Sequence, residues 1–106
     1  MAALIDGFDV ALFDLDGVVY LGPDPVPGVP EALAQLGRRG TGLMYVTNNA
    51  ARPAGTVVDQ LNNLGIEAGL EQVLTSAQVA VSALTKELPA GATVLVCGSD
   101  SLASLL

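Results

Sequence analysis

The stretch Val10-Ala-Leu-Phe-Asp-Leu-Asp-Gly17 decides the fold, because an apolar run stops abruptly at two acidic residues. The four residues before Asp14 are all apolar, which predicts a short strand that is buried on both faces. Residues 21–28 (LGPDPVPG) are too rich in proline and glycine for a helix or a central strand. The sequence therefore predicts a buried strand, an acidic strand end and then a loop.

The alternation of apolar strand and amphipathic helix continues along the chain. Helices are expected at about 29–39, at 53–63 and from the caps Thr75 or Ser76 to about 88, and a last helix begins near 100. Further strands are expected at 42–46 and 93–97. This order is typical of right-handed crossovers on a parallel sheet. The predicted fold class is α/β, a Rossmann-like parallel sheet of three strands with flanking helices.

Composition narrows the functions that the chain can have. Of 106 residues 51% are apolar and 14% are charged, which fits one small domain with a core. The net charge of −7 argues against nucleic acid as a partner. Apolar runs are too short to cross a bilayer, and the N-terminus lacks the basic residues of a secretory signal. We therefore expect a cytoplasmic protein that binds neither nucleic acid nor membrane.

The chain has one cysteine and no histidine, which limits the reactions that it can catalyse. Cys97 is the only cysteine and the chain has no histidine, so internal disulfides, Cys/His zinc sites and His-based triads are excluded. Cys97 itself is expected to be a buried small hydrophobe. Carboxylates, hydroxyls and amides must therefore carry any reaction.

Asp14, Thr47 and Gly98 each follow a predicted strand, and parallel sheets bind ligands beyond the carboxyl ends of their strands. Asp14 and Asp16 are two residues apart, so an extended backbone would point both carboxylates the same way. Two such close carboxylates are best balanced by a hard divalent cation, and Mg²⁺ fits best. One carboxylate could then attack phosphorus while the other acts as acid and base. A plain Asp-x-Asp-Gly turn is the alternative, but the position directly after a buried strand favours a site.

The polar run Thr47-Asn48-Asn49 allows two interpretations that are compatible with each other. It can cap the helix that starts near Pro53, or it can bind an anion through its hydroxyl and backbone amides. Arg52 is the only cation expected near this edge of the sheet. Its role is left open between substrate contact and a solvated surface position.

Three segments together resemble a known family. Residues 13–20 (FDLDGVVY), with Gly22 and Pro27-Gly28 after them, resemble the first motif of haloacid dehalogenase superfamily phosphatases. Residues 45–52 (YVTNNAAR) resemble the second motif, in the form typical of the class IIA branch of NagD-type and nitrophenyl phosphatases. Residues 94–98 (VLVCG) are similar to the third strand of that branch.

The resemblance implies a Mg²⁺-dependent phosphatase that hydrolyses small phosphorylated metabolites through an aspartyl-phosphate. Asp14 would be the nucleophile and a metal ligand. Asp16 would be the acid and base, with its carbonyl on the metal. Thr47 would hold the transferring phosphoryl group, and Asn48 and Asn49 would line the substrate side.

The resemblance also implies what these residues lack. Family members continue into a cap domain and return with a lysine and further acids, whereas Lys86, the only lysine here, precedes the predicted third strand. We interpret residues 1–106 as the N-terminal portion of the core, without the cap domain and the C-terminal half. Such a fragment is expected to be inactive alone and to bind Mg²⁺ weakly. The first strand would then have an exposed apolar edge, which leaves room for a homo-oligomer.

Two alternatives remain beside the phosphatase hypothesis. The chain could be a non-catalytic remnant, or a module that needs a complementary chain. A receiver-like signalling domain is disfavoured, because its acceptor aspartate would end the third strand, where Cys97 stands.

Overall fold

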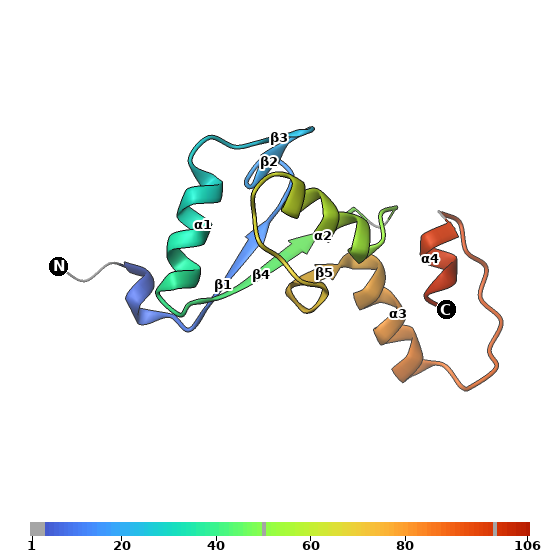
Figure 1. The fold of residues 1–106 in the computed structure, drawn as a ribbon. Helices are drawn as coiled ribbons and strands as arrows, with labels where there is room; N and C mark the ends of the chain where they lie inside the picture. The colour runs from blue at the N-terminus through green and yellow to red at the C-terminus, as the bar shows by residue number, and fades with distance from the viewer. Residues whose placement is uncertain (1–3, 50, 99) are drawn as a thin grey trace.

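The computed structural model describes residues 4–49, 51–98 and 100–106, so Ala50 of the second motif and Ser99 before the last helix lie outside the described residues. Figure 1 shows the order of the elements along the chain. They are the 3-10 helix η1 (Leu4–Gly7), β1 (Val10–Asp14), β2 (Tyr20–Leu21), β3 (Asp24–Pro25), α1 (Val29–Arg38), β4 (Gly42–Thr47), α2 (Ala54–Asn63), the 3-10 helix η2 (Leu70–Gln72), β5 (Val73–Thr75), α3 (Ser76–Glu87) and α4 (Asp100–Ser104).

The main sheet is parallel and has the strand order β1-β4-β5. Phe13 of β1 lies opposite Tyr45 of β4, which in turn lies opposite Val73 of β5. The predicted α/β class, with a parallel sheet and flanking helices, is confirmed. The bounds of α1, α2 and α3 agree with the predicted helices to within one or two residues.

The core lies on the face of the sheet that carries Phe13, Tyr45 and Val73. The first two rings stack with centroids 6.1 Å apart. Helices α1 and α2 cover this face by contributing Leu33 and the Val57–Leu61 ridge respectively. The buried members of the core are Leu15, Val19, Tyr20, Leu33, Tyr45, Val57, Leu61, Ile66 and Val73.

The opposite face of β1 is open, which corrects the prediction that this strand is buried on both faces. Leu12 is 69% exposed and Val10 is 50% exposed, because α1 and α2 both pack on the core side. Among the described helices, α3 packs against β5, which is separated from β1 by β4. The predicted exposure of the β1 edge is confirmed, since β1 is an outer strand of this sheet.

The predicted strand at 93–97 is wrong. Residues 92–97 have no regular secondary structure, Leu95 is 88% exposed, and Cys97 is exposed rather than buried. A strand needs a neighbouring strand to hydrogen-bond, and this segment has none within the described residues. The third strand of the sheet is instead β5, which was not predicted.

The predicted loop at 21–28 contains a short ladder. β2 and β3 form an antiparallel two-stranded sheet, with Tyr20 opposite Pro25. A proline fits there because an outer strand can leave one side of its backbone unpaired.

The molecule is elongated, with a radius of gyration of 16.1 Å and dimensions of 55 × 30 × 19 Å. A compact domain of this size would have a radius of gyration of about 13 Å. Figure 1 shows the reason: α3, the irregular segment after it and α4 extend away from the sheet. None of the helices in the described part of the chain is long and apolar enough to cross a membrane.

Candidate active site

The carboxyl ends of all three parallel strands meet at one edge of the sheet. Asp14 ends β1, Thr47 ends β4 and Thr75 ends β5. Thr47 and Thr75 are register partners, and Asp14 lies opposite Val46, the neighbour of Thr47 in sequence. The structure therefore brings the acidic strand end and the threonine of the second motif together, as the sequence predicts.

The two aspartates flank a residue that is anchored in the core. Leu15 is 0% exposed, whereas Asp14 and Asp16 on either side of it are exposed. This alternation is what an extended backbone produces when both carboxylates lie on the side away from the core. The Asp14 Oδ1 atom accepts a hydrogen bond from the Leu15 N–H at 2.9 Å.

The chain turns sharply just after Asp16. Gly17 has φ 84°, a left-handed conformation that glycine adopts without a steric cost. Its N–H donates to the Tyr20 carbonyl at 2.8 Å, and Asp16 forms a single bridge with Tyr20. The turn thus returns the chain to the level of Asp16 and places Tyr20 beside it.

The pKa of the Tyr20 hydroxyl depends on the charged groups around this turn. Burial raises the pKa of its hydroxyl, and the negative charges of Asp16 and Asp14 act in the same direction. The charge of Arg52 and a hydrogen bond from its side chain act in the opposite direction on the Tyr20 pKa. Arg52 is half-buried. The Arg52 side chain therefore lies near the Tyr20 hydroxyl, at the turn that follows the acidic pair.

The Thr47-Asn48-Asn49 run forms two consecutive side-chain turns. Thr47 is 3% exposed, and its Oγ1 atom accepts a hydrogen bond from the Asn49 N–H at 3.1 Å. The Asn49 Oδ1 atom accepts from the Ala51 N–H at 3.0 Å. The interpretation of these residues as the cap of the next helix is wrong, because α2 starts after Pro53 and has no side-chain cap.

Ser76 joins this site, although sequence reasoning treated it only as an alternative cap of α3. Its Oγ atom donates to the Asn48 carbonyl at 3.0 Å. The cap of α3 is Thr75, whose Oγ1 accepts from the Gln78 N–H at 3.1 Å, while the Gln78 Oε1 accepts from the Thr75 N–H at 2.9 Å. The only sequence signal for Ser76 as a site residue was its position directly after Thr75, at the end of β5, and β5 itself was not predicted.

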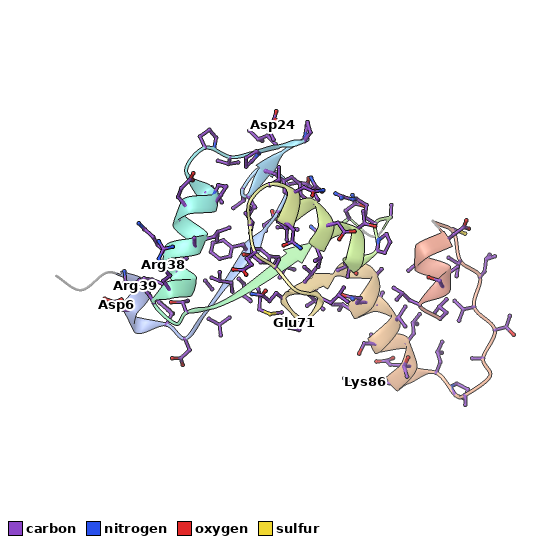
Figure 2. All side chains as sticks on the ribbon, in the orientation of Figure 1. Asp6, Asp24, Arg38, Arg39, Glu71 and Lys86 are labelled. Atoms are coloured by element: carbon purple, nitrogen blue, oxygen red, sulfur yellow. The ribbon has the colours of Figure 1, made fainter. Side chains whose placement is uncertain are left out.

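The other basic residues and Gly98 do not reach this edge. Figure 2 shows Arg38 and Arg39 near Asp6 at the end of α1, and Lys86 at the far end of α3. Arg39 forms an ion pair with Asp6. Lys86 is ten residues along the helix from Ser76, or about 15 Å along its axis. Gly98 does not follow a strand, so it contributes nothing to the expected set of strand ends.

Comparison with known proteins identifies the family. The sequence profile of the haloacid dehalogenase-like hydrolases matches residues 11–106. The chain is therefore a member of the haloacid dehalogenase-like hydrolases, which confirms the resemblance of its two motifs.

Individual relatives are phosphatases by name. The chain is 40% identical to the D-glycerol 3-phosphate phosphatase of Mycobacterium tuberculosis over 104 residues, which are 98% of this chain and 29% of that protein. It is 38% identical to the 4-nitrophenylphosphatase of Schizosaccharomyces pombe over 100 residues, which are 92% of this chain and 34% of that protein. The chain thus spans about a third of the length of these relatives.

The fold has the same relatives. The crystal structure of a glycerol phosphate phosphatase from Mycobacterium tuberculosis in complex with magnesium superimposes with a TM-score of 0.89 and 41% identity. The match covers 99% of this chain and 31% of that one. The three-stranded sheet with its helices is therefore a recurrent part of larger hydrolases.

Proposed function

We propose that this chain supplies the nucleophile of a phosphatase that hydrolyses small phosphorylated metabolites through an aspartyl-phosphate on Asp14. The observation that carries the proposal is the placement of Asp14 and Asp16, both exposed on either side of buried Leu15, beside the strand that ends at Thr47. The names of the relatives support glycerol phosphates and aryl phosphates as the substrate class. Lone exposed Cys97, which forms no disulfide, is in keeping with a cytoplasmic setting.

Each residue has a distinct role in the proposed reaction. A carboxylate oxygen of Asp14 forms a bond to phosphorus as the bond to the leaving oxygen breaks, and Asp16 gives its proton to that oxygen. Asp16 then takes a proton from the water that attacks the aspartyl-phosphate, which releases phosphate and restores Asp14.

The second motif would hold the phosphoryl group. The Thr47 oxygen already accepts the Asn49 N–H, so the hydroxyl hydrogen remains to be donated to a phosphoryl oxygen. Such a donor is most useful when it is fixed before the charge develops. Asn48 and Asn49 are exposed and would line the substrate side.

The donor set at this edge fits Mg²⁺ as its cofactor. Asp14 and Asp16 offer hard oxygen atoms, and Mg²⁺ commonly uses one or two carboxylates together with waters and substrate oxygens. Asp14 would contribute its carboxylate and Asp16 its backbone carbonyl. When bound, the ion would offset the negative charge that nucleophile and phosphate share. A relative crystallised with magnesium supports this assignment.

Residues 1–106 alone would be almost inactive, as one part of a larger core. Within the described residues no group of three or more acidic, histidine or cysteine side chains gathers around one point, so these residues would offer the metal the Asp14 carboxylate and the Asp16 carbonyl without a third acidic side chain. Among the described basic residues, Arg52 lies near Tyr20 in the turn after Asp16, whereas Lys86 lies at the far end of α3. We propose that the rest of the core and the cap domain complete the site.

A module that assembles with a complementary chain is the second candidate. The open face of β1, with Leu12 and Val10 exposed, favours it. Co-purification of a second polypeptide that buries this face would distinguish the module from a single-chain phosphatase.

The test uses the full-length gene product and nitrophenyl phosphate with Mg²⁺. Asp14→Asn should lower kcat by about 10³-fold or more, because it removes the nucleophile. Asp24→Asn is the matched control, since Asp24 is an exposed aspartate at the tip of the β2–β3 hairpin. An acid-quenched reaction should yield a phosphorylated peptide that contains Asp14. Equal turnover by the Asp14 and Asp24 variants would refute the proposal.

A further inference from the structure

The peptide unit that joins Asn48 to Asn49 is held at both ends by hydroxyl groups. Its carbonyl, which belongs to Asn48, accepts from the Ser76 Oγ at 3.0 Å. Its N–H, which belongs to Asn49, donates to the Thr47 Oγ1 at 3.1 Å. In a planar trans peptide the carbonyl and the N–H point in opposite directions. Thr47 at the end of β4 and Ser76 at the start of α3 therefore hold one peptide plane from opposite sides.

We propose that Ser76 is a positioning residue of the phosphate site, which acts by fixing this peptide unit and thereby the direction of the Thr47 hydroxyl. The inference rests on the proposed function, because it assigns Thr47 to the phosphoryl group. It adds a third segment, the junction of β5 and α3, to the two motifs that sequence reasoning recognised.

The link between Ser76 and Thr47 follows from what a hydroxyl can do. A threonine hydroxyl has one hydrogen to donate and two lone pairs to accept with. While the Asn49 N–H occupies a lone pair of Thr47, the hydrogen of Thr47 points elsewhere and stays available. If the peptide unit turned, the Thr47 hydroxyl would lose this partner and could itself donate to the backbone. Hydrogen bonds in series also polarise one another, so the Ser76 contact strengthens the Asn49 contact.

Ser76 is itself held firmly enough to act as a support. It is the first residue of α3 and lies between buried Thr75 and buried Ala77. The reciprocal hydrogen bonds between Thr75 and Gln78 fix this turn. Thr75 is also the register partner of Thr47, so the distance between the two strand ends is set by the sheet.

The test compares Ser76→Ala, Ser76→Thr and the control Ser82→Ala in the full-length protein. Ser82 lies on the same helix and is exposed. Loss of one hydrogen bond should weaken the affinity for inorganic phosphate, measured calorimetrically with Mg²⁺, by about three- to tenfold. kcat/KM for nitrophenyl phosphate should fall in parallel, because the Thr47 hydroxyl also serves the charge that develops on the phosphoryl group. Ser76→Thr keeps a hydroxyl and should restore most of the affinity, while Ser82→Ala should match the wild type.

A structural role alone would give a different pattern. If Ser76→Ala lowers the melting temperature but leaves phosphate affinity equal to that of Ser82→Ala, the inference is overturned. If Ser76→Ala does not fold, Ser76→Cys replaces it, because a thiol of similar size is only a weak donor.

A double-mutant cycle with Thr47→Val tests the route of the effect. If Ser76 acts through Thr47, adding Ser76→Ala to Thr47→Val should cause no further loss of phosphate affinity. Additive losses would overturn the inference. A wild type without Asp14-dependent turnover would contradict the proposed function itself. An active wild type with an unaffected Ser76→Ala variant would contradict only the role of Ser76.

Discussion

Thr47 and Thr75 lie side by side as register partners at the carboxyl ends of β4 and β5, and both side chains are buried. Their hydroxyls nevertheless do different things. The Thr47 oxygen closes the turn to Asn49, whereas the Thr75 oxygen caps α3. The Thr75 hydroxyl thus maintains the fold, whereas we propose that the Thr47 hydroxyl serves the phosphate site.

Replacing Thr75 should therefore affect stability first. Thr75→Ala removes the oxygen that accepts the Gln78 N–H and should lower the free energy of unfolding by about 1–2 kcal/mol. Thr85→Ala is the control, because exposed Thr85 bonds only to the Val81 carbonyl of its own helix. Its effect should stay within about 0.5 kcal/mol. Urea denaturation measures both, and equal effects would contradict the assignment of Thr75 as the cap.

Two glycines should respond to alanine in opposite ways. Gly17 has φ 84° in the turn after Asp16, so Gly17→Ala should cost about 1 kcal/mol or more of stability. Gly55 lies in α2 with open space around it, so Gly55→Ala should stabilise by about 0.5–1 kcal/mol. Thermal or urea unfolding measures the difference. A stabilising Gly17→Ala would mean that the turn does not hold the conformation described.

The open side of β1 should make residues 1–106 self-associate when they are isolated. An outer strand with an exposed apolar side chain offers both hydrogen-bonding groups and a hydrophobic surface to a second copy. Leu12→Lys should shift the chain toward monomer in sedimentation velocity runs. Leu70→Lys is the control, because Leu70 is similarly exposed but lies in η2, outside the strands. Equal shifts by both variants would point to a general effect of charge.

The hydroxyls of Tyr20 and Tyr45 should ionise at a higher pH in the folded chain than in the unfolded chain, and their ionisation should promote unfolding. Burial raises the pKa of Tyr20 and of Tyr45 above the usual value of 10.0. A group whose pKa is raised on folding stabilises the fold below its unfolded pKa, and this contribution is lost as pH rises through the folded pKa. Stability from these groups should therefore be complete below pH 10 and fall above it.

The measurement is simple because the chain has two tyrosines and no tryptophan. Near-ultraviolet absorbance of tyrosinate should rise at higher pH in the folded chain than in urea. Tyr20→Phe leaves only Tyr45 to titrate, which separates the two contributions. Coincident curves for folded and unfolded chain would show that neither phenol is protected.

The sequence predicted the parts of the fold that local patterns determine. The apolar run before Asp14 and the run before Thr47 gave β1 and β4, and the helices followed from apolar spacing and from glycine and proline at their ends. The position of both motifs at one edge followed from the parallel order of the strands. These features depend on periodicity, which a single sequence carries.

The errors arose where a neighbour decides the outcome. Residues 93–97 have the composition of a strand, but they lack a partner strand within the described residues. Val73–Thr75 is too short to show a strand pattern in the sequence. It nevertheless pairs with β4, because the connection through α2 places it beside that strand. Leu12 looks like a core residue and is exposed, because helices cover one face of β1 only. Ser76 was missed as a site residue because its partner is 28 positions away.

The central position of β4 has a consequence for the dynamics of the chain. Among the described strands, β4 alone has a hydrogen-bonded neighbour on each side. Deuterium should therefore enter its amides last, at a rate that reports opening of the whole sheet, whereas the outward amides of β1 should exchange early. The exchange rate of the β4 amides would then measure the global unfolding of the domain, whereas that of the β1 amides would measure local opening at the edge of the sheet.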